Sequence, residues 1–269
     1  MIIFPGCKLN IGLSILHKRE DGYHNLESVF LPVPLFDSLE FIESSEMSFQ
    51  CNLELDNEKS NSILLAYHLL NEVYYLPPIS IFLHKQIPMG AGLGGGSSNG
   101  AAMLVGLNKQ FNLGLSVTEL EKYALQIGAD CPFFIQNKPK LVHGIGEIFT
   151  DISVPLSGKW IALVNPAIHI STKQAFENLT IKKTPNSPIA DVIENHPIKD
   201  WKNSIFNDFE EGVFSQFPEI EGIKNKLYEV GAEFASMTGT GSTVFGIFDK
   251  EPSLSHWPHS YFVRTVKLG

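Results

Sequence analysis

The chain has 269 residues, of which 43% are hydrophobic and 18% charged, and this composition suits one large or two modest globular domains. A net charge of −9 at pH 7 argues against a general nucleic-acid or anionic-membrane surface, because both need clustered Lys and Arg. Three cysteines without a CxxC pair argue against a zinc knuckle or a disulfide framework, and no apolar run has the roughly eighteen residues of a membrane-spanning helix. We therefore expect a cytoplasmic protein with neither a nucleic-acid nor a membrane partner.

Strands dominate the first part of the chain. From Lys8 to Ile15 apolar residues alternate with polar or small ones, which predicts a half-buried strand with Lys8 and Asn10 side by side on its polar face. Asp21 and Gly22 predict a turn after this strand. Three further runs of strand-forming residues follow, over 27–33, 39–43 and 47–55. We expect the four strands to form one antiparallel sheet.

Helical and extended segments alternate from residue 61 onward. A period of three to four residues, together with capping boxes at Ser116 and Ser171, predicts helices over 61–76, 97–111, 116–128, 171–176, 207–217 and 220–230. Strands are predicted over 79–83, 160–164 and 261–267, and a strand pair within 233–248 flanks a Gly-rich turn at 238–242. We expect a loop with at most a short helix over 181–197. A connection at 155–159 divides the chain into domains 1–155 and 156–269, and an alternative returns the last strand to the first domain.

The most informative stretch is PMGAGLGGGSSNGAA, from Pro88 to Ala102, which lies between a predicted strand and a predicted helix. Its six glycines let the backbone bring several N–H groups close to a ligand. The helix that follows directs its free N–H groups and its positive dipole end at the same place. This arrangement is typical of a phosphate site.

Three alternatives compete for this stretch. A flexible Gly/Ser linker is disfavoured because an apolar helical stripe continues directly from it. A Walker A loop is excluded because Ser97, rather than Lys, follows Gly96. The dinucleotide pattern GxGxxG is present, but residues 85–88 separate it from the preceding strand and a second helix follows the first, so a Rossmann site is disfavoured.

Asp130 is a second candidate for a functional residue, because it precedes a Cys-Pro-Phe-Phe run and has largely apolar neighbours in the sequence. A carboxylate in such surroundings can act as a base, but an aspartate that caps a turn is an open alternative. The local pattern alone slightly favours the capping role.

Three separated stretches resemble the GHMP kinases, the superfamily of galactokinase, homoserine kinase, mevalonate kinase and phosphomevalonate kinase. They are GCKLNIGL at 6–13, the phosphate-loop segment 88–98, and MTGTG at 237–241. The resemblance implies an α+β fold of two domains, an N-terminal domain of the ribosomal-protein-S5-like type and a ferredoxin-like C-terminal domain, with the active site in the cleft between them. ATP and Mg²⁺ are then the expected cofactors, and a monomer or a homodimer is the expected state.

Further motifs narrow the resemblance to one branch of this superfamily. KLNIGL, DGYHNLESVF, GAGLGGGSSN, GADCPFF, NDFE and SMTGTGSTVFG are similar to the branch that phosphorylates the 2-hydroxyl group of a methylerythritol bearing a cytidine diphosphate, in the non-mevalonate isoprenoid pathway. The expected partner is therefore a small molecule with a cytidine diphosphate moiety. A GHMP kinase of the homoserine or mevalonate type, and a GHMP-fold protein that binds without turnover, stay open as alternatives.

The resemblance also implies roles for individual residues. Lys8 and Asp130 match the catalytic pair, with Asp130 as the base. Substrate contacts are implied for Asn10, Tyr23, His24, Thr172 and Phe176, where Tyr23 and Phe176 stack on the cytosine and His24 hydrogen-bonds its edge. ATP contacts are implied for Asn61, near the adenine, and for Pro88, Gly90, Ala91, Gly92, Leu93, Gly94, Gly95, Gly96, Ser97, Ser98 and Gly239.

Two positions depart from the family pattern or have more than one interpretation. Gly6 and Cys7 precede Lys8 where the family often has Pro-Ala or Asn-Ala, and we interpret Cys7 as a packed small residue in preference to a reactive thiol. Ser98 is expected either to contact Mg²⁺ or a phosphate, or to cap the helix that begins at the loop. The sequence assigns no Mg²⁺ ligand.

Overall fold

The computed structural model describes residues 1–54, 61–177, 179, 188–255 and 257–269. Its helices are α1 (Ser62–Tyr74), α2 (Gly95–Gln110), α3 (Val117–Ile127), α4 (Cys131–Gln136), α5 (Thr172–Glu177), α6 (Ile189–Asn195), the 3-10 helix η2 (Ile198–Asn203), α7 (Glu210–Gln216) and α8 (Pro218–Glu229). Its strands are β1 (Ile2–Ile3), β2 (Gly6–Lys18), β3 (His24–Phe36), β4 (Ser38–Glu43), β5 (Ser48–Cys51), β6 (Ile79–His84), β7 (Lys140–His143), β8 (Ile148–Asp151), β9 (Trp160–Asn165), β10 (Phe234–Met237), β11 (Val244–Phe248) and β12 (Phe262–Lys267). None of these described helices is both long and apolar enough to span a membrane.

The described chain packs as two compact units, each discontinuous in sequence. Unit 1 comprises Met1–Cys7, Leu35–Met89 and Gly94–Lys138, and unit 2 comprises Lys8–Pro34, Gly90–Leu93 and Pro139–Gly269. The phosphate-loop segment is divided between them, because residues 90–93 pack with unit 2 and Gly94 onward packs with unit 1. The domain boundary near residue 155 follows the sequence rather than this packing and stays a prediction.

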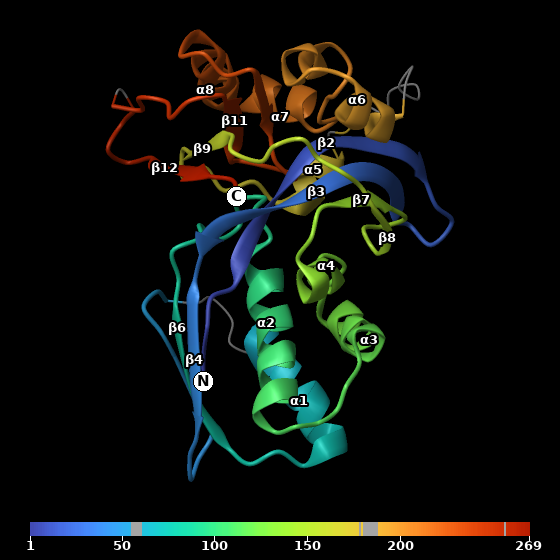
Figure 1. Ribbon diagram of the computed structural model, residues 1–269, viewed down its shortest axis with the longest axis vertical. Coiled ribbons are helices and arrows are strands. Elements are labelled where there is room, and N and C mark those ends of the chain that lie inside the picture. The colour runs from blue at the N-terminus through green and yellow to red at the C-terminus, as the bar shows by residue number, and fades with distance from the viewer. Residues whose placement is uncertain (55–60, 178, 180–187, 256) are drawn as a thin grey trace. The chain divides into compact units, whose positions relative to one another are not determined.

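In unit 1, helices α1 and α2 lie beside the sheet with strand order β1-β4-β6-β5, and α3 packs against these two helices (Figure 1). Alternate residues of β6 are buried, which directs one face of this strand toward the helices. The core between the two layers includes Phe41 and Ile81 from the sheet, and Leu70 and Leu104 from the helices.

Strand β5 corrects the expected antiparallel sheet. It pairs in parallel with β6, whereas β2 and β3 belong to a different sheet of order β2-β3-β7-β8. Parallel neighbours need a long crossover, and α1, which lies between β5 and β6 in the chain, supplies it. β5 is also shorter than predicted, and Leu55, the end of the predicted strand, lies outside the described residues.

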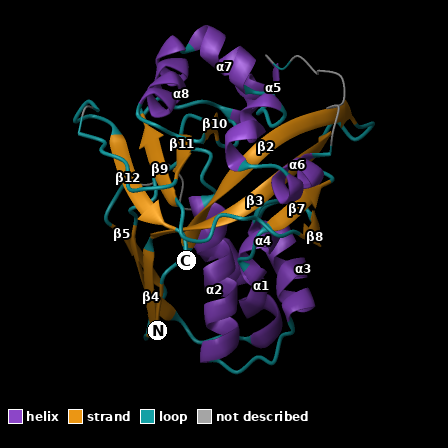
Figure 2. Ribbon diagram, turned by 45° about the horizontal axis from the view of Figure 1, so that its top comes forward, coloured by secondary structure: helices purple, strands orange, loops and turns teal. Residues whose placement is uncertain are grey.

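Unit 2 contains the antiparallel sheet β10-β11-β9-β12, with α8 packed against β10 and β11 (Figure 2). The predicted strand pair around the second Gly-rich turn is confirmed as β10 and β11, and the closing strand is confirmed as β12. β12 pairs with β9, so the last strand lies in this sheet. Of the predicted loop 181–197, residues 181–187 lie outside the described residues and α6 is its short helix.

Strand β2 is buried on both faces, which corrects the expected half-buried strand. Its apolar face directs Leu13 and Ile15 into the core of unit 2. Lys8 and Asn10 lie on the other face and are only 4% and 2% exposed. This face can be polar and still be buried, because its side chains form hydrogen bonds within the protein rather than with solvent.

Candidate active site

Lys8 and Asn10 are neighbours on β2, as the alternation predicted. The Lys8 Nζ donates to Asn10 Oδ1 at 2.5 Å and lies 4.3 Å from the centroid of the Phe30 ring. Asn10 Nδ2 donates to Ser28 Oγ at 3.0 Å, and the Asn10 backbone N–H donates to Thr238 Oγ1 at 3.0 Å. A buried ammonium group is costly unless polar groups surround it, so this network holds a positive charge at a fixed position.

The two Gly-rich segments are in direct contact within unit 2. Thr238 Oγ1 donates to the Gly92 carbonyl at 3.1 Å, and the Lys8 N–H donates to the Leu93 carbonyl at 2.9 Å. A Cβ atom on Gly92 would lie 2.1 Å from the Thr238 carbonyl oxygen, and a Cβ atom on Gly239 would lie 3.1 Å from the Gly92 Cα. Only glycine fits so close an approach. The structure thus brings the second Gly-rich turn to the phosphate loop and to Lys8.

The other residues of this half of the loop anchor it. Ala91 and Leu93 are 3% and 1% exposed, and the Ala91 carbonyl accepts a hydrogen bond from the Thr243 N–H at 3.4 Å. Pro88 is partly buried, whereas Gly90 is exposed. Ala91 and Leu93 therefore anchor this part of the loop, whereas Gly90 and Gly92 carry no side chain and leave main-chain groups at its surface.

Helix α2 begins at Gly95, two residues before the predicted start, with Gly94 as its N-cap in the left-handed conformation. Gly94 has no side chain with which to cap this end, so the first-turn N–H groups and the helix dipole suit an anion. Gly96 is exposed, and no atom lies within 4 Å of a Cβ atom placed on it. Ser98 is buried inside the first turn and is not the N-cap, so the expected alternative that it caps this helix is wrong.

Asp130 lies between α3 and α4 in unit 1 and is partly buried. It occupies the N-cap position of α4, where its side chain makes no capping hydrogen bond to that helix. The expected turn-capping role stays a prediction. The neighbouring Cys131 thiol hydrogen-bonds Ser97, and burial raises the pKa of this thiol to about 11. It stays protonated at neutral pH and is no nucleophile. Cys7, fully buried in β2, agrees with its interpretation as a packed residue.

Two of the predicted cytosine-binding residues contact each other directly. His24, the first residue of β3, stacks on Phe176 of α5 with ring centroids 4.9 Å apart and an interplanar angle of 24°. Phe176 also meets Phe209 edge to face at 4.9 Å. Tyr23 is 61% exposed, and Thr172, at the start of α5, is exposed as well. A flat base that stacks on Phe176 must therefore use the face that His24 does not cover, or displace His24.

Asn61 has a structural role at the start of α1. It is the N-cap, and its Oδ1 accepts the Ile63 N–H at 2.9 Å. The next residue, Ser62, donates from its hydroxyl to the Gly96 carbonyl at 2.6 Å, which ties the start of α1 to the start of α2. The predicted adenine contact of Asn61 stays a prediction.

The NDFE motif at 207–210 contains residues whose role the sequence did not reveal. Asn207 Nδ2 donates to the carbonyls of Met237 and Gly239, both at 2.8 Å. Glu210 Oε1 accepts the Met237 N–H at 2.8 Å, and its other oxygen pairs with Lys224 at 2.7 Å. The motif therefore holds the second Gly-rich turn. The NDFE motif is visible in the sequence and could have drawn attention to these residues. The backbone groups of the Gly-rich turn that it binds lie about thirty residues further along the chain, and residue spacing does not identify them.

Replacing Asn207 with alanine is expected to destabilise the protein by about 1–3 kcal/mol, because two carbonyl groups each lose a donor inside the protein. Urea unfolding measures this loss. Asn195→Ala is the matched control, since Asn195 makes one exposed hydrogen bond to Asp191 and its loss should change stability by less than about 0.5 kcal/mol. Equal unfolding midpoints for the two variants would contradict the assigned role of Asn207.

Two family models match the chain, described as GHMP kinases N terminal domain over residues 61–138 and GHMP kinases C terminal over residues 189–255. The 4-diphosphocytidyl-2-C-methyl-D-erythritol kinase of Azobacteroides pseudotrichonymphae is 48% identical and aligns with 93% of this chain and 94% of its own length. The enzyme of the same name from Bacteroides thetaiotaomicron is 47% identical over the full length of both chains.

Solved structures of kinases are similar to this chain in fold. A crystal structure of 4-(cytidine 5'-diphospho)-2C-methyl-D-erythritol kinase matches with a TM-score of 0.80 and 27% identity, covering 100% of both chains. A crystal structure of homoserine kinase from Cytophaga hutchinsonii matches with a TM-score of 0.71 and 14% identity, covering 93% of this chain and 85% of that chain. The second match is a likeness of fold alone.

Proposed function

The chain belongs to the GHMP kinases, within their 4-diphosphocytidyl-2-C-methyl-D-erythritol kinases, and we propose that it transfers a phosphoryl group from ATP to the 2-hydroxyl group of that cytidyl compound. The predicted α+β GHMP kinase fold is confirmed. The observation that carries the choice of substrate is the full-length similarity to enzymes of this name, since the homoserine kinase match is a likeness of fold alone. Three free cysteines fit a reducing cytoplasm, which is the proposed location.

Asp130 is proposed as the base that accepts the proton of the substrate hydroxyl group. An alcohol is a poor nucleophile, so a carboxylate that removes its proton as the bond to phosphorus forms lowers the barrier. Lys8 is proposed to keep this carboxylate ionised and to stabilise charge on the transferred phosphoryl group. The two residues belong to different compact units, and the match to the family motifs supports their pairing.

The phosphate loop and the start of α2 are proposed to bind ATP through backbone N–H groups. The absence of a side-chain cap at Gly94 and the open space beside Gly96 support this role. Among the described residues no three His, Cys, Asp or Glu side chains form a ready metal site, but nucleotide-bound Mg²⁺ needs only one or two carboxylates beside phosphate oxygens and water. Ser98 is the proposed side-chain contact, and Mg²⁺ would neutralise phosphate charge there.

Substrate recognition is proposed to rest on the aromatic residues of unit 2. Phe176 offers a ring face to the cytosine, Tyr23 is exposed enough to cover its opposite face, and His24 can hydrogen-bond its edge once the His24–Phe176 stack opens. Asn10 and Thr172 are proposed to position the remainder of the substrate.

A coupled ADP-release assay tests this function. Purified protein is offered ATP and Mg²⁺ with the cytidyl substrate, mevalonate or homoserine in separate reactions. ADP release with the cytidyl substrate alone is the expected result. Release with mevalonate or homoserine instead indicates another GHMP kinase, and no release above background with any of the three indicates a protein that binds without turnover.

The pH dependence of substrate binding tests the role of His24. Burial of the imidazole, with a smaller contribution from Lys18, lowers the pKa of His24 below its ordinary value of 6.5. His24 is therefore neutral at pH 7 and offers one donor and one acceptor to the cytosine edge. We expect the KM for the cytidyl substrate to be constant above pH 6.5 and to rise as His24 becomes protonated at lower pH.

The His24→Gln variant is the comparison for this profile. It cannot titrate, so its KM for the cytidyl substrate should be higher than that of the wild type at pH 7 and should not depend on pH. The KM for ATP should be the same in both proteins. A wild-type acid limb that persists in His24→Gln would assign the titration to another group.

A further inference from the structure

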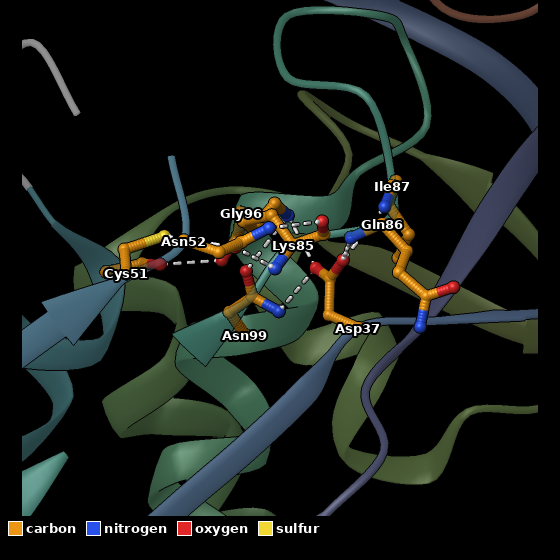
Figure 3. Close-up of polar contacts among 9 residues, drawn as sticks. Asp37, Cys51, Asn52, Lys85, Gln86, Ile87, Gly96 and Asn99 are labelled. Carbon is orange, nitrogen blue, oxygen red and sulfur yellow. Dashed lines mark hydrogen bonds and ion pairs between the residues drawn. The ribbon is translucent and has the colours of Figure 1, made fainter. Parts of the chain in front are cut away.

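A cluster of buried polar side chains underlies both ends of the phosphate loop in unit 1 (Figure 3). The Lys85 Nζ donates to Asp37 Oδ2 at 2.5 Å and to Asn99 Oδ1 at 3.2 Å, and Asn99 Nδ2 donates to Asp37 Oδ2 at 2.9 Å. Each of the three side chains thus contacts the other two. Asp37 is 0% exposed, Asn99 2% and Lys85 7%, so the cluster lies almost entirely out of solvent.

The cluster holds the segment that enters the loop. Asp37 Oδ1 accepts the Gln86 N–H at 2.7 Å and the Ile87 N–H at 2.9 Å, which fixes the backbone directly before Pro88. Asp37 itself lies between β3 and β4, where its N–H donates to the Pro5 carbonyl at 3.0 Å. One carboxylate therefore fixes the entry to the loop through one oxygen and binds Lys85 and Asn99 through the other.

The same cluster holds the segment that leaves the loop. Asn99 is in the first turns of α2, and its side chain connects this helix start to Asp37 and Lys85. A Cβ atom on Gly95, the first residue of α2, would lie 3.2 Å from the Lys85 Nζ and 2.9 Å from the Ile87 Cγ2. The ammonium group thus packs against the helix end whose N–H groups face the proposed phosphate site.

Stability is a weak explanation for such a cluster. Removing two charges from water is costly, and buried ion pairs can often be replaced by apolar side chains of similar volume without loss of stability. The charged cluster adds directional hydrogen bonds to backbone groups, which apolar side chains cannot form. Here those bonds connect the two ends of one loop.

We propose that Asp37, Lys85 and Asn99 are positioning residues that set the spacing between the two ends of the phosphate loop and thereby determine the affinity for ATP. The inference rests on the proposed function of this loop and assigns the three residues no contact with the cytidyl substrate. Their loss raises the KM for ATP selectively. Removing Lys85 alone has a second effect, because it leaves a buried carboxylate unpaired close to the phosphates.

The test compares Lys85→Met and Asn99→Ala with the matched control Lys140→Met. Lys140 is also a buried lysine, 6% exposed, and it pairs with Asp151 at 2.5 Å on strands β7 and β8 of unit 2. We expect Lys85→Met to raise the KM for ATP by at least about tenfold and Asn99→Ala to raise it several-fold, with the KM for the cytidyl substrate unchanged within twofold. Lys140→Met should change neither KM.

Two measurements keep the test decisive. Thermal unfolding identifies variants that do not fold, and Asn99→Ala, which keeps the ion pair, remains informative if Lys85→Met is one of them. Direct titration of each protein with ATP, without the second substrate, gives an affinity that does not depend on turnover. Wild-type protein that binds ATP but releases no ADP would contradict the proposed function while the affinities still test the inference. Folded variants with wild-type ATP affinity, or with equal rises in both KM values, would overturn the inference alone.

Discussion

Replacing Asp130 with asparagine is expected to lower kcat by roughly 10²–10⁴-fold, the usual contribution of a general base. Asparagine has nearly the same size as aspartate but cannot accept the proton of the substrate hydroxyl group. Because asparagine also keeps the shape of aspartate, the substitution should leave the local fold intact. Steady-state kinetics give kcat, and titration with ATP should give an affinity close to that of the wild type.

Glu121→Gln is the matched control for this variant. Glu121 is another carboxylate of unit 1, on α3, where its Oε1 accepts a hydrogen bond from Gln136 at the end of α4. Its loss changes the same region without touching the proposed base, so kcat should stay within about twofold of the wild type. Turnover by Asp130→Asn at the rate of this control would remove Asp130 as the base.

Replacing Gly92 with alanine is expected to destabilise the protein by about 2–5 kcal/mol. The Gly92 φ of +75° costs an alanine about 1–2 kcal/mol, and the clash of its Cβ with the Thr238 carbonyl, 2.1 Å away, adds about 1–3 kcal/mol. Urea unfolding measures the loss. The KM for ATP should also rise, because the loop and the second Gly-rich turn must separate to make room.

Gly158→Ala separates the two contributions. Gly158 has a similar φ of +79°, but no atom lies within 4 Å of a Cβ atom placed on it, so alanine there meets only the backbone strain. Its expected cost is about 1–2 kcal/mol, with an unchanged KM for ATP. If the two variants lose the same stability, the close approach of Gly92 to Thr238 contributes nothing.

Elements with a strong local pattern were predicted well. α3 has the capping box that Ser116 and Glu119 indicated, and the strands β4, β6 and β9 lie within about one residue of their predicted ranges. Helix α4 was missed because it has only six residues and begins with a cysteine, a proline and two phenylalanines, which carry little helical signal. The parallel pairing of β5 was missed because the direction of a strand depends on the path of the chain that follows it, here through α1.

The candidate site was predicted in its parts and not in its contacts. Alternation along β2 placed Lys8 and Asn10 on one face, but their burial depends on Ser28 and Thr238, which lie on other elements. The stacking of His24 on Phe176 joins residues about 150 positions apart, and no local period encodes such a contact. The sequence did not predict a buried role for Asp37 and Lys85, because a charged residue usually lies at the surface.

By itself the sequence determined the positions of most helices and strands, the two Gly-rich segments and the family to which they belong. These properties depend on residue types and on short spacings between residues, and both can be read directly from the sequence. Tertiary structure alone decided that the Gly-rich segments meet at Gly92 and Thr238, that the polar face of β2 is buried, and that Asp37, Lys85 and Asn99 join the two ends of the phosphate loop. The reason is that each of these contacts joins residues from different elements. Such a contact contributes to the free energy of folding only after those elements have packed together.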